Sequence, residues 1–225
     1  MRRFQVGRAV KRSFDIAAAL LGLIVLSPLI LAICLVVRWR MGGPVLFRQR
    51  RTGYRGRAFG ALKFRSMNSR KDKHGNLLPD AKRIGRIGRL LRKTSLDEIP
   101  QLLNVLRGEM SIIGPRPLLP KYDLWYTRSE LRRFEVRPGI TGLAQVAGRN
   151  TVRWNERLAF DVQYVERWSL WLDVKILAQT VKVVLRRDGV AEDPRDLMLD
   201  LDDERATAMT EELVLRSEDL ALLRG

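Results

Sequence analysis

Two adjacent carboxylates, Asp97 and Glu98, could carry phosphoryl-transfer chemistry. They follow Ser95 at the start of a segment whose apolar spacing predicts a helix over residues 96–107 that ends at Gly108. The N-terminus of a helix lowers the pKa of a carboxylate, which keeps a nucleophile ionised, and it presents backbone N–H groups to a phosphate. The pattern also fits a capping box, in which both acidic residues serve only the helix, and this structural interpretation stays open.

Several basic residues could neutralise a phosphate beside this pair. Arg92 precedes it in the sequence, and Lys63 and Arg65 lie on a predicted strand. Arg116 and Arg137 each stand next to proline, which removes part of their backbone freedom and favours a fixed anion-binding role. A single surface arginine is usually only solvated. A carboxylate nucleophile, a metal ion and several cations together describe a phosphoryl-transfer site.

The kind of metal is limited by the composition. The chain has one cysteine, Cys34, and one histidine, His74, which excludes an internal disulfide framework and a structural zinc site made of Cys and His. A metal ion must therefore bind carboxylate and phosphate oxygens, a donor set that suits Mg²⁺. Asp97 and Glu98 are the candidate ligands.

The strands and helices that the sequence predicts around these residues indicate an α+β, mostly helical fold. Strands are predicted over 44–50 and 58–66, joined by a glycine- and arginine-rich turn into a short β-hairpin. A helix is predicted over 81–92, and glycine- and proline-rich loops, where binding residues tend to lie, over 109–150. Helical spacing returns over 151–187, where Trp and Tyr residues suit either the membrane headgroup layer or a protein core.

A long apolar segment near the N-terminus indicates membrane contact. Residues 16–37 form a run of 22 residues without a charge, which reaches about 33 Å as a helix. Basic residues flank the run on both sides, and a single straight span cannot keep both flanks in the cytoplasm. Ser27 and Pro28 near its middle break the helix and predict a re-entrant hairpin. An ordinary spanning helix with a proline kink is the alternative.

The charge is concentrated in the N-terminal part of the chain. Residues 1–93 hold 23 Lys or Arg and three acidic residues, which suits an anionic lipid bilayer or a nucleic acid as partner. Residues 188–225 hold 12 acidic and four basic residues and predict an acidic, partly disordered tail with one short amphipathic helix. We therefore expect a basic flank with the membrane helix over 1–41, a membrane-associated catalytic domain over 42–187, and this tail.

Six motifs follow one another in a fixed order: KRSFDI at 11–16, Ser27-Pro28, LKFRSM at 62–67, SLDEIPQLLNVLRGEMSIIGPRP at 95–117, RPGITGLAQVAGR at 137–149 and YVERWSLWLD at 164–173. This ordered set resembles the bacterial sugar transferase family, the monotopic phosphoglycosyl transferases. Many relatives carry four extra spanning helices before this region, so the chain resembles the minimal form.

The resemblance implies a ping-pong reaction with Mg²⁺ at the cytoplasmic face of the bacterial inner membrane. Asp97 attacks the sugar-linked phosphate of a nucleotide-diphosphate sugar, commonly a UDP-sugar, and polyprenyl (undecaprenyl) phosphate then takes the phosphosugar from the enzyme. The implied role of Glu98 is to hold the metal or orient the phosphate. Amphipathic helices are expected at the membrane interface around the site. The implied substrate-binding residues are Lys63, Arg65, Arg92, Pro115, Arg116, Arg137, Gln145 and Arg149.

Two alternatives compete with this interpretation. A nonenzymatic, membrane-tethered basic module could bind anionic lipid or nucleic acid, but no nucleic-acid motif is present and the loops with Arg116 and Arg137 would have no role, so we expect no nucleic-acid partner. A transferase with a spanning helix could let the lipid phosphate attack the donor directly, without a covalent enzyme intermediate. The sequence leaves the sugar, the glycan pathway and the oligomeric state open, a homodimer included.

Overall fold

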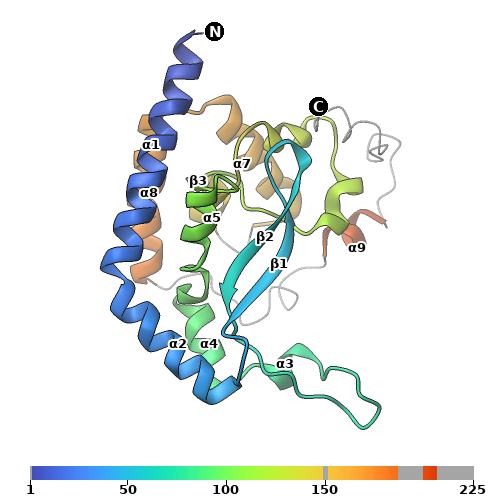
Figure 1. The fold of residues 1–225 in the computed structure, drawn as a ribbon. Coiled ribbons are helices and arrows are strands. Elements are labelled where there is room, and N and C mark those ends of the chain that lie inside the picture. Colours follow the sequence, from blue (N-terminus) through green and yellow to red (C-terminus); the bar gives the residue numbers. More distant parts are fainter. Residues whose placement is uncertain (1, 149–151, 187–199, 207–225) are drawn as a thin grey trace.

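The described part of the chain is mostly helical, with two small sheets at its centre (Figure 1), which confirms the predicted α+β class. The computed structural model describes residues 2–148, 152–186 and 200–206. An antiparallel hairpin pairs β1 with β2, and a short parallel pair joins β3 and β4. The helices are α1 (Arg2–Val25), α2 (Ser27–Met41), α3 (Asp80–Arg83), α4 (Arg86–Lys93), α5 (Gln101–Arg107), α6 (Leu143–Ala147), α7 (Trp154–Glu166), α8 (Leu170–Arg186) and α9 (Leu201–Ala206), and the strands are β1 (Leu46–Thr52), β2 (Ala58–Phe64), β3 (Ser111–Ile113) and β4 (Gly139–Thr141).

The β1–β2 hairpin lies where the sequence predicts it, and α5 fixes its inner strand. Leu46 pairs with Phe64 at the open end of the hairpin. Asn104 of α5 is fully buried, and its amide donates to the Gly60 carbonyl (2.8 Å) and accepts from the Leu62 backbone N–H (2.9 Å). Because both amide atoms are satisfied by strand β2, the hairpin and the helix hold one fixed relation.

The apolar N-terminal segment is broken at the predicted place. Helices α1 and α2 meet at a bend of 63°. Pro28 lies in the first turn of α2, and the Ser27 hydroxyl donates to the Ile24 carbonyl (2.7 Å), which satisfies a carbonyl near the break. Among the described residues no single helix is long and apolar enough to cross a bilayer, whereas the bent pair is so when taken together.

Both arms of this bent pair rest on the same body. The guanidinium of Arg12 in α1 donates to two carbonyls at the end of α5, at 2.7 and 3.1 Å. In α2, Val37 is fully buried in a cluster with Phe64 and Leu91. Apolar side chains are exposed on both sides of the bend, namely Leu20, Leu21, Ile24, Val25, Leu29, Leu31, Leu35 and Val36.

The aromatic residues of the two long C-terminal helices divide between core and surface. Trp154 and Tyr164 are buried, and Tyr164 donates a hydrogen bond to Asp173 (2.8 Å). Lys11 from α1 reaches the same carboxylate at 2.8 Å, which ties α1 to α8. Trp171 is 65% exposed. Of these three aromatic residues it alone is therefore accessible to the headgroup layer of a membrane, one of the two alternatives that the sequence leaves open.

The predicted helix over 81–92 is wrong in one respect, because it forms two helices. Helix α3 ends at Arg83 and α4 begins at Arg86, with Ile84 in an extended conformation between them. Gly88 packs so closely that an added Cβ would lie 1.9 Å from the Ser66 carbonyl oxygen. Gly88 therefore allows the close approach of α4 to Ser66, just after the hairpin.

Helix α9, within the acidic tail, packs into the core. Leu201 is fully buried in a cluster with residues of the 118–158 region. Arg205 donates to both carboxylate oxygens of Glu130 (2.6 and 2.7 Å) and to the Asn155 side chain (3.0 Å). Lys121 pairs with two tail aspartates at 2.7 and 2.9 Å. These contacts make α9 part of the packed body.

Removal of the Leu201 side chain is expected to destabilise this body. Leu201→Ala should lower the free energy of unfolding by about 3 kcal/mol, because it leaves a cavity in a closed cluster. Leu124→Ala is the matched control, since Leu124 is 54% exposed and its truncation should change the value by less than about 0.5 kcal/mol. Denaturant unfolding of the purified protein measures both, and equal effects of the two variants would contradict the docking of α9.

Candidate active site

Asp97 and Glu98 lie in a single 3₁₀ turn, Leu96–Glu98, before helix α5. Ser95 has a left-handed backbone (φ 57°) and its side chain makes no capping hydrogen bond, so the predicted capping box is wrong. The predicted helix start at residue 96 is also wrong, because α5 begins only at Gln101. Pro100 supplies the reason, since it lacks the N–H that a helix starting at 96 would need.

Glu98 is clamped by two cations from two different elements. Lys63 on β2 donates to Glu98 Oε1 at 2.7 Å. Arg116 donates to Oε1 through Nη2 (2.6 Å) and to Oε2 through Nη1 (3.3 Å). Burial opposes ionisation of Glu98, but the charges and hydrogen bonds of Arg116 and Lys63 outweigh it and lower its pKa. Glu98 is therefore a fixed anion at neutral pH.

Asp97 is in a different electrostatic position from its neighbour. Its side chain receives no hydrogen bond and no ion pair from any residue that the structure describes, although the residue is only 7% exposed. Burial raises its pKa, and Glu98 raises it further, against the charges of Lys63, Arg116 and Arg92. The expected lowering by a helix N-terminus is wrong, because Asp97 precedes the first turn of α5.

The two other cations predicted near the hairpin, Arg92 and Arg65, differ in whether they act on Asp97. Arg92 on α4 donates to the Ser66 hydroxyl (3.1 Å), and its charge acts on Asp97, so it belongs to the surroundings of the Asp97–Glu98 dyad. Arg65 donates to two backbone carbonyls (2.8 and 2.9 Å) and to the Ser69 hydroxyl (2.6 Å). These contacts commit Arg65 to the adjoining loop, and its described hydrogen bonds do not reach the dyad.

The two glycine- and proline-rich motifs meet beside strands β3 and β4. Gly139 donates to the Pro115 carbonyl (2.9 Å), and an added Cβ on Gly114 would lie 2.4 Å from the Arg137 carbonyl oxygen. This close backbone contact positions the loop that carries Arg116. The Arg137 side chain turns elsewhere, because its Nε donates to the Gly108 carbonyl at the end of α5 (2.8 Å).

The last two predicted residues follow β4. Gln145 lies on α6, and neither its amide nitrogen nor its amide oxygen has a hydrogen-bond partner although both are buried. An unpaired buried amide is available to hydrogen-bond to a ligand. Arg149 lies outside the described residues.

Arg51 is a neighbour of the site that the sequence motifs do not predict. Its guanidinium donates to the Pro117 carbonyl (3.3 Å), and burial together with the charge of Arg116 lowers its pKa to about 10. In the sequence it belongs to the basic flank that follows the apolar run 16–37, and its neighbours Arg48 and Arg50 in that flank are exposed. Nothing in the run of arginines distinguishes the one that turns inward.

The chain matches the family model described as bacterial sugar transferase over residues 6–187, which include the dyad and its cations. The chain belongs to the bacterial sugar transferase family. A relative in Bacillus subtilis, an uncharacterized sugar transferase EpsL, is 50% identical over 181 residues, which cover 80% of this chain and 90% of the relative. Family members of longer length are also similar.

Two of these longer family members carry informative names. The Caulobacter vibrioides UDP-glucose:undecaprenyl-phosphate glucose-1-phosphate transferase is 43% identical over 191 residues, which cover 80% of this chain and 71% of the relative. The Salmonella typhimurium undecaprenyl-phosphate galactose phosphotransferase is 43% identical over 200 residues, which cover 81% of this chain. The chain spans only 42% of that relative's length.

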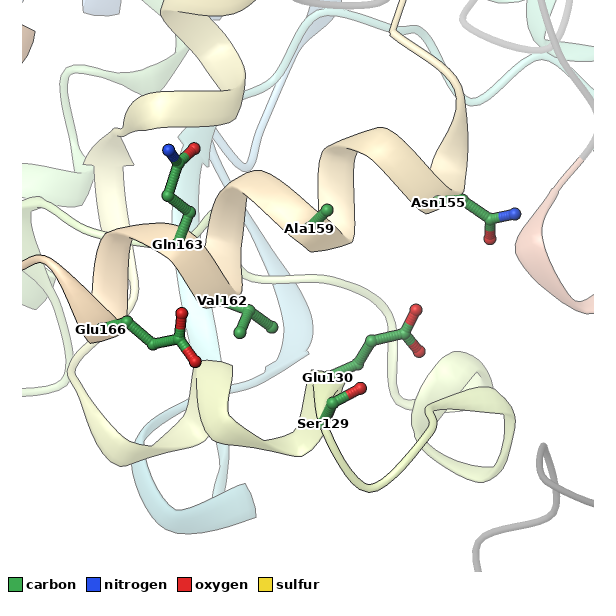
Figure 2. Close-up of a pocket in the computed structure, with 7 residues that line it drawn as sticks. All are labelled: Ser129, Glu130, Asn155, Ala159, Val162, Gln163 and Glu166. Atoms are coloured by element: carbon green, nitrogen blue, oxygen red, sulfur yellow. The ribbon is translucent and has the colours of Figure 1, made fainter.

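A surface groove of this chain lies away from the Asp97–Glu98 dyad. It has a volume of about 260 Å³ and lies between helix α7 and the 3₁₀ segment Glu130–Glu135 (Figure 2). None of the predicted site residues lines it, and its Glu130 is already held by Arg205. The charged groups around Asp97, and not this groove, mark the candidate active site.

Proposed function

We propose that this chain is a polyprenyl-phosphate sugar-1-phosphate transferase that uses a UDP-sugar and undecaprenyl phosphate at the cytoplasmic face of the bacterial inner membrane. Asp97 Oδ attacks the sugar-linked phosphorus, the bond from this phosphorus to the bridging oxygen breaks, and UMP leaves with that oxygen. A phosphate oxygen of undecaprenyl phosphate then attacks the same phosphorus and releases Asp97. The names of the two longer relatives support this donor and acceptor class.

The unequal surroundings of the two carboxylates carry the proposal. Glu98 is neutralised by Lys63 and Arg116, whereas Asp97 beside it makes no hydrogen bond among the described residues. A carboxylate held by two cations is a poor nucleophile, and one without donors keeps its lone pairs for attack. Arg116 is 38% exposed at its side chain, so it remains able to stabilise charge on a transferring phosphoryl group.

The dyad also fits the proposed Mg²⁺. Asp97 offers a carboxylate without protein donors, and Glu98 Oε2 has only the 3.3 Å contact with Arg116. Mg²⁺ typically binds one or two carboxylates together with substrate phosphates and water. When bound, the ion would neutralise charge on the diphosphate, and Asp97 with Glu98 would hold it.

The bent α1–α2 pair supports monotopic insertion as part of the same proposal. Because Arg12 and Val37 on the two arms contact one body, both arms approach the membrane from the same side. The exposed apolar side chains around the bend then enter the bilayer, and the basic flanks face anionic headgroups. The exposed Trp171 of α8 is a further group for this interface.

Cysteine labelling is expected to place both flanks in the cytoplasm. In a Cys34→Ala background, Arg3→Cys and Arg40→Cys should react with a membrane-impermeant maleimide only after the inner membrane is opened. The two substitutions report on opposite arms of the bend. Labelling of either position in sealed spheroplasts would contradict the re-entrant arrangement and favour a straight span.

Product release without an acceptor tests the reaction itself. Purified protein with Mg²⁺ and a panel of UDP-sugars, but without lipid phosphate, is expected to release about one UMP per active site in a burst. Direct attack by the lipid predicts no UMP until undecaprenyl phosphate is added. A nonenzymatic basic module predicts no UMP under either condition, and the panel also identifies the sugar.

A further inference from the structure

Arg133 lies outside the cations that the motifs single out, yet it is bonded to the backbone of the loop that carries Arg116. Its Nη2 donates to the Arg116 carbonyl (2.6 Å) and to Asp161 Oδ2 of α7 (2.9 Å). Its Nη1 donates to the Tyr126 hydroxyl (2.8 Å). One guanidinium therefore connects helix α7 to the residue that clamps Glu98.

Arg133 is too enclosed to contact a substrate. Its side chain and that of Asp161 are each 2% exposed. The cavity that Arg133 shares with Arg116 measures about 10 Å³, which is near the lower limit for a single water and far below the size of a phosphate group. Any effect of Arg133 on the reaction must therefore act through Arg116.

The backbone at Arg116 transmits such an effect to its side chain. Prolines at 115 and 117 supply no N–H groups, and a residue before proline is restricted to extended conformations. With so few backbone states available, the bond from Arg133 to the Arg116 carbonyl also sets the direction of the Arg116 Cα–Cβ bond. That direction aims the guanidinium at Glu98.

Folding stability is a weak explanation for this buried pair. Burial raises the pKa of Asp161 to about 6 although the charge of Arg133 opposes this. At neutral pH the folded state therefore holds Asp161 in the form that burial disfavours. Buried ion pairs commonly contribute little net stability over apolar residues of similar volume, which favours a role beyond stability for this one.

We propose that the Arg133–Asp161 pair positions Arg116 against Glu98, and that its contribution appears in the rate of phosphosugar transfer. The inference rests on the proposed function, because it assigns the pair to the first half-reaction. Arg133 and Asp161 are positioning residues in this scheme, and they do not touch the reacting atoms.

A double-mutant cycle with Arg116 tests the assignment. Asp161→Asn and Arg133→Met are each expected to slow UMP release about 10- to 50-fold, mainly in kcat, because small misplacements of a catalytic group have effects of this size. In an Arg116→Ala background the same changes should have less than about a twofold effect, since no side chain is left to position. Arg133→Lys, which keeps the positive charge but places all its donors on one nitrogen, should recover part of the rate. Arg132→Met is the matched control, because the Arg132 side chain is 42% exposed and pairs with surface glutamates, and it should stay within about twofold of the parent.

Undiminished effects in the Arg116→Ala background, or a normal rate in both variants, would overturn the proposal.

Hydrogen exchange supplies a readout that needs no activity. In Asp161→Asn the amides of residues 111–119 should exchange at least about tenfold faster, whereas those of residues 46–51 in β1 and those of β2 should not change. A wild-type protein that releases no UMP refutes the proposed function alone. Unchanged exchange in residues 111–119 refutes the positioning role whether or not the enzyme is active.

Discussion

Asp97→Asn is expected to reduce UMP release at least about 10⁴-fold, because an amide cannot attack phosphorus. The substitution preserves the size of the side chain. The fold should tolerate the change well. Asp97 has no hydrogen bond to lose among the described residues, and burial already disfavours its charge, so the free energy of unfolding should not fall. Single-turnover assays with the sugar identified from the panel measure the first effect, and denaturant unfolding measures the second.

Asp80→Asn is the matched control for this substitution. Asp80 is a carboxylate on α3 whose side chain is 45% exposed and pairs with Arg83, so its neutralisation should change the rate less than about twofold. A normal burst in Asp97→Asn would remove the nucleophile assignment. Turnover that persists in Asp97→Asn only when undecaprenyl phosphate is present would favour direct attack by the lipid.

Arg116→Ala is expected to lower the rate of UMP release about 10³-fold, because it removes a donor to the transferring phosphoryl group. It also leaves Glu98 with Lys63 as its one remaining ion pair among the described residues. Arg116→Lys keeps the charge but not the two-pronged contact with Glu98, and a loss of about 10- to 30-fold is expected. Steady-state assays at several donor concentrations separate the effects on kcat and KM.

The matched control for Arg116 is Arg128→Ala. The Arg128 side chain is exposed and makes no hydrogen bond or ion pair among the described residues, so its truncation should leave the rate within about twofold of the parent. Equal rates for the two alanine variants would mean that Arg116 has no part in the reaction. A large rise in KM with an unchanged kcat would instead make Arg116 a residue of ground-state binding.

Several parts of the fold follow from local sequence rules. Pro28 cannot continue the hydrogen bonding of α1, and the bend is found at that point. Gly108 adopts the left-handed conformation (φ 82°) that ends a helix, as expected for glycine after α5. The two short strands are predicted on either side of a turn with glycines, and β1 and β2 form there. Each of these features is decided by residues close in sequence.

The parts that could not be predicted depend on contacts between distant residues. Arg12 belongs to a basic flank by composition, yet it caps α5 more than 90 positions later. Leu201 lies in an acidic segment whose sequence gives no sign of the cluster that receives it. The raised pKa of Asp97 arises from burial by surrounding elements, and a local argument from the helix terminus gives the opposite sign.

The most direct test of the account is the mass of the protein after incubation with the donor and Mg²⁺ in the absence of lipid. We expect intact mass spectrometry to show an increase by one phosphosugar, peptide mapping to place it on Asp97, and hydroxylamine to remove it, since an acyl phosphate is labile to this nucleophile. Undecaprenyl phosphate should discharge the adduct as the lipid-linked product forms. An unmodified mass in a preparation that completes turnover, or an adduct on another residue, would contradict the covalent role of Asp97.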